Sequence, residues 1–247
     1  MKKRYFGKMV NVNNHKMHVY SEGNGIPALV FMSGSSTYFP VNDFSKLFTK
    51  MSNDYKIVVI ERAGYGFSET SNSSRDIDTV LFETRTALKE TKINPPYILF
   101  PHSMAGIEAF YWAQNFPEEI KAIVGLDIGL PIFYEKVNYN KIIKFMKIIS
   151  KIFPKIITND MVNEAILGNA NGKKINIETI KNIPMLLFVS NGKGTRIKKD
   201  EWKKLFDEYT KELNVILDHL EGGHYLHNYF PEEISIKSKD FIKEILK

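Results

Sequence analysis

A serine at the tip of a strand–turn–helix segment is the residue of this chain best placed to act as a nucleophile. The apolar run 96–100 leads almost directly into Ser103, and a helix-patterned segment, 107–116, follows at once. A turn this tight exposes a serine hydroxyl at its apex. Small residues are needed where strand and helix nearly touch; Ala105 provides one, whereas Pro101 stands on the other side. Taken alone, the segment fits a purely structural junction equally well.

A serine hydroxyl becomes a useful nucleophile when a base lies within hydrogen-bond reach. His224 is the leading candidate, because it follows two glycines after the last predicted strand, in a loop that can reach back to Ser103. The alternative is a loop histidine that contacts only solvent. The other histidines fall in the N-terminal hairpin, beside the serine, at a strand end and in a helix: His15, His18, His102, His219 and His227.

The base in turn needs a carboxylate that orients its imidazole ring. The loop 190–195, after the seventh predicted strand, carries no acid, whereas Asp127 ends the strand that follows the helix of Ser103. We therefore predict Asp127 as the acid, with a plain turn residue as the alternative for this position. Asp200 is the second candidate, although its place before a helix is typical of an N-cap.

Acyl-transfer chemistry also needs hydrogen-bond donors for the oxyanion. We predict the backbone N–H of Met104, because it follows the serine at the positive end of a helix. We predict the N–H of Ser35 as the second donor, since Gly34 lets that loop approach closely.

Apolar runs alternate with helix-patterned segments along the whole chain. This alternation predicts an α/β fold with a mostly parallel sheet and helices on both faces. The predicted strands cover residues 5–12, 16–21, 28–32, 55–60, 96–100, 120–126, 184–189 and 214–217. Because ligands bind at the carboxyl ends of such strands, the fold should gather Ser35, Ser103, Asp127 and His224 on one rim.

The composition limits the classes of function. The chain has 247 residues, of which 43% are hydrophobic, and it contains no cysteine, which excludes disulfides, thiolate nucleophiles and cysteine-ligated metals. The net charge of +6 is spread along the chain, which favours a lysine-rich surface over nucleic-acid binding. No apolar run approaches the ~20 residues of a membrane span, and no secretory signal pattern follows the basic start, so we expect a cytoplasmic protein.

Four motifs in order resemble the α/β-hydrolase superfamily over essentially the whole chain. They are Phe31-Met32-Ser33-Gly34-Ser35, Glu61-Arg62-Ala63-Gly64-Tyr65-Gly66-Phe67-Ser68, Pro101-His102-Ser103-Met104-Ala105-Gly106 and Gly222-Gly223-His224-Tyr225. The resemblance implies an eight-stranded sheet, a Ser–acid–His triad and a helical cap inserted after the sixth strand. It also implies hydrolysis of an ester, amide, lactone or related bond without a cofactor or metal.

The chain departs from the family pattern at three places. Ser33 replaces the common histidine of the oxyanion loop, Pro101 replaces the first glycine around the serine, and the usual acid position after the seventh strand is empty. Some members carry the acid after the sixth strand, which supports Asp127.

The resemblance divides the chain into a core of residues 1–129 and 184–247 and a cap of residues 130–183. Within the cap, lysines recur at helical spacing, and apolar residues supply another face. The lysines are Lys141, Lys144, Lys147 and Lys151; the apolar residues are Ile142, Ile143, Phe145, Met146, Ile149 and Ile152. We expect the apolar face to roof the active site and the lysines to be solvated; docking on a lipid surface is the less favoured interpretation.

These inferences predict a cofactor-independent serine hydrolase, an esterase that cleaves a small, hydrophobic acyl substrate. Cleavage of an amide, lactone or carbon–carbon bond by the same residues is the alternative within the enzyme class. A non-catalytic small-molecule binding protein on the same fold is the alternative outside it. The sequence predicts no nucleic-acid partner and leaves the oligomeric state open.

Overall fold

The structure, a computed structural model, describes residues 7–195 and 197–247. Within these ranges the strands form one mixed sheet in the order β1-β2-β4-β3-β5-β6-β7-β8. The strands are β1 (Lys8–Val12), β2 (His15–Glu22), β3 (Ala28–Met32), β4 (Ile57–Glu61), β5 (Tyr97–Pro101), β6 (Ile120–Leu126), β7 (Met185–Val189) and β8 (Val215–His219). Residues 1–6, where the predicted strand 5–12 begins, lie outside the described part.

The sheet is parallel except at its N-terminal edge. Strand β2 pairs antiparallel with both β1 and β4, and the neighbouring pairs from β4 to β8 are parallel. Every residue of β3, β4, β5 and β7 is buried, as expected for strands that are covered on both faces. The predicted fold class is therefore confirmed: a mostly parallel sheet of eight strands among the described residues, with helices on both sides.

The helices cover the two faces of the sheet. They are α1 (Pro40–Phe48), α2 (Ile77–Glu90), α3 (Ala105–Asn115), η1 (Pro117–Glu119), α4 (Pro131–Lys136), α5 (Asn140–Ile152), α6 (Asn159–Gly172), η2 (Ile177–Ile180), α7 (Lys199–Tyr209), α8 (Leu226–Tyr229) and α9 (Pro231–Ile245). Helices α2, α3 and α7 bury their apolar faces against one side of the strands. Helices α1 and α9 pack on the other side.

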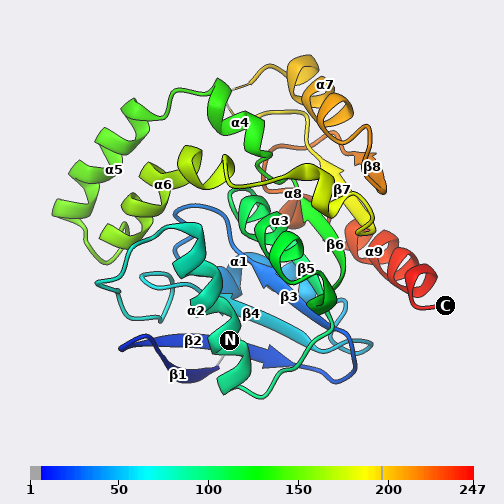
Figure 1. The fold of residues 1–247 in the computed structure, drawn as a ribbon, viewed down its shortest axis with the longest axis horizontal. Coiled ribbons are helices and arrows are strands. Elements are labelled where there is room, and N and C mark those ends of the chain that lie inside the picture. The colour runs from blue at the N-terminus through cyan, green and yellow to red at the C-terminus, as the bar shows by residue number, and fades with distance from the viewer. Residues whose placement is uncertain (1–6, 196) are drawn as a thin grey trace.

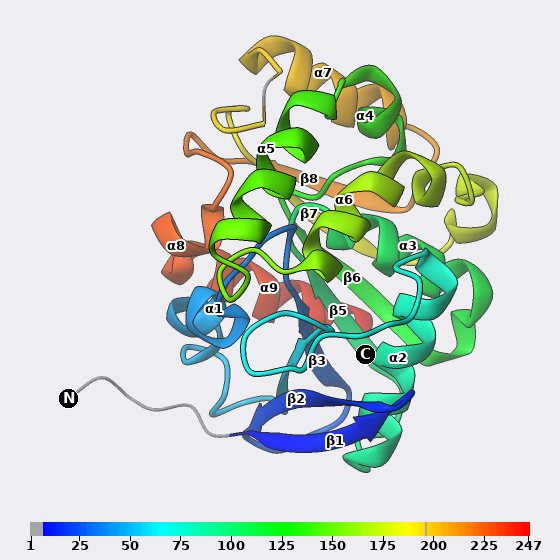
Figure 2. The ribbon, with the colours of Figure 1, turned by 90° about the vertical axis from the view of Figure 1, so that its left-hand side faces the viewer.

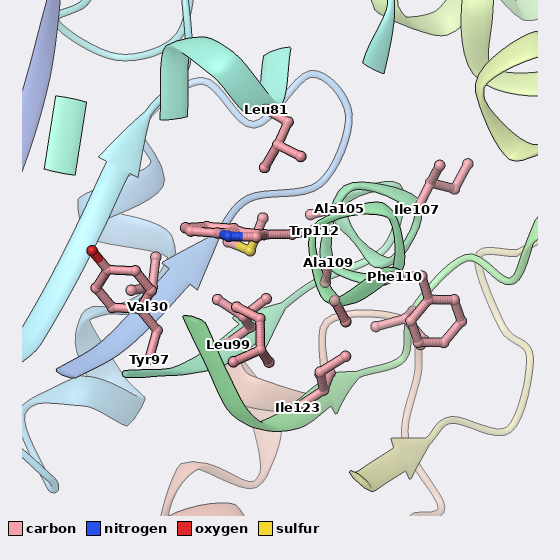
Figure 3. Close-up of a cluster of buried hydrophobic side chains, with 14 of the residues drawn as sticks. Val30, Leu81, Tyr97, Leu99, Ala105, Ile107, Ala109, Phe110, Trp112 and Ile123 are labelled. Carbon is pink, nitrogen blue, oxygen red and sulfur yellow. The ribbon is translucent and has the colours of Figure 1, made fainter. Parts of the chain in front are cut away.

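Helix α3 is the helix on which the Ser103 turn depends. Its apolar residues enter the core cluster together with strand residues, and Figure 3 shows Trp112 among Leu81, Tyr97 and Leu99. Trp112 is fully buried, and its indole N–H donates to Glu119 at 2.7 Å, so this large side chain is both packed and hydrogen-bonded. This packing fixes the start of α3 beside the end of β5.

The residues between β6 and β7 fold as α4, α5, α6 and η2. Figure 1 shows α4, α5 and α6 as a green arc at the upper left, with α5 outermost. These helices belong to the segment that we expect to be a cap, residues 130–183; the division into core and cap stays a prediction. None of the helices in residues 7–195 and 197–247 is long and apolar enough to cross a membrane.

Candidate active site

Ser103 lies in the turn between β5 and α3 with a left-handed backbone. Its φ is +53°, a conformation that costs an L-residue about 1–2 kcal/mol. The carbonyl of Ser103 accepts a hydrogen bond from the N–H of Gly129 at 2.7 Å, which helps to hold the turn. A Cβ atom on Gly34 would lie only 2.8 Å from the Cβ of Ser103, so the loop after β3 can come this close because it carries glycine. The turn therefore places Ser103 beside the loop that follows β3.

His224 lies between the serine and a carboxylate. Its Nε2 is 2.8 Å from Oγ of Ser103, and its Nδ1 is 2.6 Å from Oδ2 of Asp127. The backbone N–H of His224 donates to the carbonyl of Lys193 at 3.0 Å, which ties the histidine loop to the loop after β7. The structure thus brings three of the predicted site residues into one continuous hydrogen-bonded chain.

Asp127 is fully buried directly after β6, and its φ is +48°. Its Oδ1 accepts hydrogen bonds from the backbone N–H of Ser190 at 2.7 Å and from the indole N–H of Trp202 at 3.0 Å. Both carboxylate oxygens therefore have partners, which compensates for burial of the charge. Asp200, the alternative acid, is exposed in the first turn of α7, so the carboxylate beside His224 is Asp127.

Ser35 and Met104 line the same cavity as Ser103 and His224. Within the described part of the chain, the backbone N–H of Ser35 and that of Met104 donate to no hydrogen-bond acceptor. Met104 immediately precedes α3, so its N–H belongs to the positive end of that helix. The two predicted oxyanion donors are thus available at the cavity; their role stays a prediction.

His102 contributes a contact that the sequence did not suggest. Its Nε2 lies 3.1 Å from the carbonyl oxygen of His224, and because a carbonyl can only accept, Nε2 carries the proton. Burial lowers the pKa of His102 well below its usual value, and the nearby His227 and His224 lower it further, so the ring stays neutral. His102 therefore tethers the main chain of the catalytic candidate His224 to the strand that carries the serine.

A group of possible metal ligands lies next to this tether. One ligand atom from each of Asp43, His102 and His227 lies within 4.8 Å of the others. However, Nε2 of His227 is 3.1 Å from Oδ2 of Asp43, and Nε2 of His102 bonds to His224. These hydrogen bonds make the group a polar contact between α1, α8 and the serine turn, and we assign no metal to it. Nδ1 of His102 and Nδ1 of His227 are buried without a hydrogen-bond partner among the described residues.

The cavity beside Ser103 has a volume of about 130 Å³. Apart from the residues already described, it is lined by Gly129, Phe133, Tyr134, Tyr139, Ala165, Gly194, Thr195 and Trp202. Apart from His224 the lining side chains carry no ionisable charge at neutral pH, and aromatic rings from α4 and α7 dominate it.

The expectation that α5 roofs the cavity is wrong. Among the described residues, those of α5 are absent from the cavity lining, which α4 and α6 supply through Phe133, Tyr134 and Ala165. In α5 the predicted apolar residues Phe145 and Ile152 are 63% and 59% exposed. The amphipathic pattern correctly indicates a helix, but it cannot tell which of its faces is covered.

A buried ionic network connects α6 to the loops of the site. The guanidinium of Arg62 donates to the carbonyl of Ser33 at 2.8 Å and pairs with Glu164 of α6 at 3.2 Å. The hydroxyl of Tyr65 donates to the same carboxylate at 2.7 Å. Because Ser33 begins the loop that carries Ser35, this network fixes the oxyanion loop and α6 relative to each other.

Glu108 of α3 forms the inner edge of the network. Its carboxylate lies 3.7 Å from Arg62 and accepts a hydrogen bond from the Thr84 hydroxyl at 2.6 Å. Burial raises the pKa of Glu108 to about 7, although Arg62 and Thr84 act to lower it. The network can therefore gain or lose a proton near neutral pH.

Comparison with known proteins places this geometry in a family. A family model described as alpha/beta hydrolase fold matches residues 24–158, more than half of the chain. The chain belongs to the α/β hydrolase fold family. It is similar to the uncharacterized protein YbdG of Bacillus subtilis (strain 168), with 35% identity over 97% of this chain and 86% of that protein.

Two solved structures show the same fold. A haloalkane dehalogenase loop variant, DbeA-M1 from Bradyrhizobium elkanii, is 14% identical with a TM-score of 0.74, and the match covers 96% of each chain. The epoxide hydrolase VrEH1 from Vigna radiata is 17% identical with a TM-score of 0.72, over 96% of this chain and 97% of that one. Together with the family match, these similarities support a hydrolase, while the reaction has to be argued from the site itself.

Glu108 gives a prediction on the pH dependence of stability. Between the ordinary carboxyl pKa of 4.5 and about 7, the folded protein keeps a proton on Glu108 that the unfolded chain releases. The free energy of unfolding should therefore fall as the pH rises through this window. A glutamine at this position stays neutral at every pH. The fall in the free energy of unfolding over the same window should therefore be smaller in Glu108→Gln than in the wild type, by on the order of 1–3 kcal/mol.

Urea denaturation at a series of pH values measures this difference. Glu118→Gln, at an exposed position just after the same helix, is the matched control and should follow the wild type. Parallel pH curves for the wild type and Glu108→Gln would show that the proton is not held there.

Proposed function

We propose that the protein is a cofactor-independent serine hydrolase that cleaves a carboxylic ester through an acyl-enzyme. The observation that carries the proposal is the chain of short contacts from Ser103 through His224 to Asp127, at 2.8 and 2.6 Å. A hydroxyl, a base within hydrogen-bond reach and a group that orients the base are what nucleophilic catalysis by serine requires.

The proposed reaction proceeds in two halves. Nε2 of His224 takes the proton of Ser103 as Oγ attacks the carbonyl carbon, and Asp127 stabilises the imidazolium that forms. The N–H groups of Ser35 and Met104 hold the oxyanion. Collapse of the tetrahedral intermediate expels the alcohol with the proton from His224. Water then attacks the acyl-serine with the same base and releases the carboxylic acid.

The nature of the nucleophile separates this proposal from the activities named for the structural neighbours. Displacing a halide or opening an epoxide with a serine would join Oγ to a saturated carbon and leave an ether. Water does not readily cleave an ether, so Ser103 would be consumed after one reaction. Attack on a carbonyl instead leaves an ester, which the same site can hydrolyse, and Ser103 therefore favours acyl substrates.

The cavity supports a neutral, hydrophobic acyl group as the substrate part next to Ser103. Its lining is rich in aromatic side chains and, apart from His224, offers no cation for a carboxylate or phosphate. The N–H groups of Ser35 and Met104 have no hydrogen-bond partner among the described residues, and both residues line the cavity of Ser103. Together with a hydroxyl that is already bonded to a base, they favour an enzyme over a non-catalytic binding protein. A cytoplasmic location remains our expectation.

Removing the nucleophile tests the proposal. Ser103→Ala should lower kcat for p-nitrophenyl butyrate by roughly 10³-fold or more and abolish labelling by a fluorophosphonate, because no other group can form the acyl-enzyme. Ser21→Ala, which removes an exposed hydroxyl on β2, is the matched control and should behave like the wild type. Unchanged turnover and labelling in Ser103→Ala would refute the role of this serine.

The acid is tested by comparing two amide substitutions. Asp127→Asn turns the carboxylate next to Nδ1 of His224 into a neutral group, which should lower kcat by about 10³–10⁴-fold. Asp200→Asn changes an exposed residue of α7 and should leave kcat within about twofold of the wild type. The reverse ranking in steady-state kinetics would mean that the acid has been assigned to the wrong residue.

The tether from His102 is tested by a pair of substitutions. His102→Leu removes the N–H that holds the His224 carbonyl and should lower kcat by up to ~10-fold, the worth of one hydrogen bond. His102→Gln can still donate from its side-chain amide and should recover part of the loss, with KM unchanged in both variants. If kcat fell equally in His102→Leu and His102→Gln, in parallel with thermal stability, His102 would contribute only to packing.

A further inference from the structure

Helix α5 lies on the outside of the molecule. It packs against α6, where Met146 joins a small cluster with Met161 and Val162. Figure 1 shows α5 at the outer edge of the arc of helices, and Figure 2, turned by 90°, shows it on the side that faces the viewer. Within α5 the buried residues are Met146 and Ser150, so one side of the helix is covered and the rest is open.

The open side of α5 carries a stripe of large apolar residues. Phe145, Ile148 and Ile152 are 63%, 49% and 59% exposed, and their spacing of three and four residues puts them on one line along the helix. Two further apolar residues follow in the chain, Phe153 and Ile156, which are 52% and 46% exposed. Large exposed apolar patches on a protein mark sites of interaction.

Lysines accompany the apolar stripe along its whole length. Lys144, Lys147 and Lys151 each directly precede a residue of the stripe, which places them beside it on the helix; Lys141 and Lys155 lie at its two ends. All five are exposed, and among the described residues none of them forms an ion pair. Residues 140–156 contain no aspartate or glutamate, so the charge of this surface is positive throughout.

We propose that this surface, the α5 face formed by Phe145, Ile148, Ile152 and their lysines, docks the protein on an anionic lipid membrane. The helix would lie in the plane of the membrane, with the apolar stripe in the boundary between headgroups and acyl chains and the lysines at the lipid phosphates. Long lysine side chains reach sideways to headgroups while their neighbours insert. The proposal concerns binding and goes beyond the hydrolase function.

The positive charge of the α5 face favours an anionic membrane over the other possible partners. A second copy of the chain docked through the same face would bring five lysines against five lysines with no acid in the helix to pair them. An acidic polar partner would satisfy the lysines but would leave the apolar stripe in water. An anionic membrane surface supplies negative charge and an apolar layer together.

The position of α5 relative to the cavity gives the docking a consequence. Tyr139 is the N-cap residue of α5 and also lines the cavity beside Ser103. Docking through α5 would therefore hold the cavity close to the lipid surface, where hydrophobic esters concentrate.

The test is co-sedimentation of the full chain with vesicles of phosphatidylcholine alone or with one quarter phosphatidylglycerol, at low and high salt. We expect binding to the anionic vesicles, weakened at least tenfold by high salt because the lysine contribution is screened, and much weaker binding to phosphatidylcholine. Failure to bind anionic vesicles at low salt would overturn the proposal.

Variants separate the α5 face from general charge. The triple change Phe145→Ser, Ile148→Ser and Ile152→Ser, and the triple change Lys144→Gln, Lys147→Gln and Lys151→Gln, should each reduce binding at least tenfold. Lys89→Gln, Lys121→Gln and Lys211→Gln together remove as much charge from exposed positions outside α5 and should bind like the wild type. Equal losses in the α5 and control lysine variants, or none in either α5 variant, would contradict the assigned surface.

Further measurements separate membrane docking from catalysis, self-association and misfolding. Ser103→Ala should bind vesicles as the wild type does, and hydrolysis of a water-soluble ester should be unchanged in the α5 variants, so docking and catalysis succeed or fail separately. Sedimentation velocity without vesicles should show a monomer. A dimer that disappears in the variant with Phe145→Ser, Ile148→Ser and Ile152→Ser would assign the α5 face to a second copy of the chain instead. Thermal unfolding checks that each variant is folded.

Discussion

Two neighbouring strands are followed by residues with a left-handed backbone, and the geometry of the site depends on this constraint. A bridge between His102 and Leu126 extends the pairing of β5 and β6, and the residues that come directly after these two, Ser103 and Asp127, have φ of +53° and +48°. Such backbone is costly for L-residues, and hydrogen bonds of both residues to adjoining segments help to hold it. The two side chains can therefore meet His224 from adjacent strand ends.

Further buried contacts hold this arrangement in place. Trp202 and Ser190 bind the buried carboxylate of Asp127, so that its second oxygen is directed to His224. Arg62 links the oxyanion loop to Glu164 of α6, which means that the helices after β6 are fastened to the site by charge as well as by packing. Because breaking a buried ion pair leaves an uncompensated charge, the pair between Arg62 and Glu164 resists separation of α6 from the loop of Ser33.

The sheet and the central residues could be predicted because their signals are local. Apolar runs define strands, and strand ends place Ser103, Asp127 and His224 on one rim. The partners of these residues depend on contacts between distant segments: Trp202 looks like a core residue of α7, and nothing in the sequence pairs Glu164 with Arg62. The prediction for α5 failed because periodicity gives an apolar face, whereas packing on α6 decides which face is covered.

In the proposed reaction, Ser103 becomes acylated during turnover. Rapid-quench mass spectrometry of the wild type with p-nitrophenyl butyrate measures this directly. We expect a butyryl group on the peptide that contains Ser103, formed in step with a burst of p-nitrophenolate. Steady turnover with no acylated peptide, or with the acyl group on another residue, would contradict it.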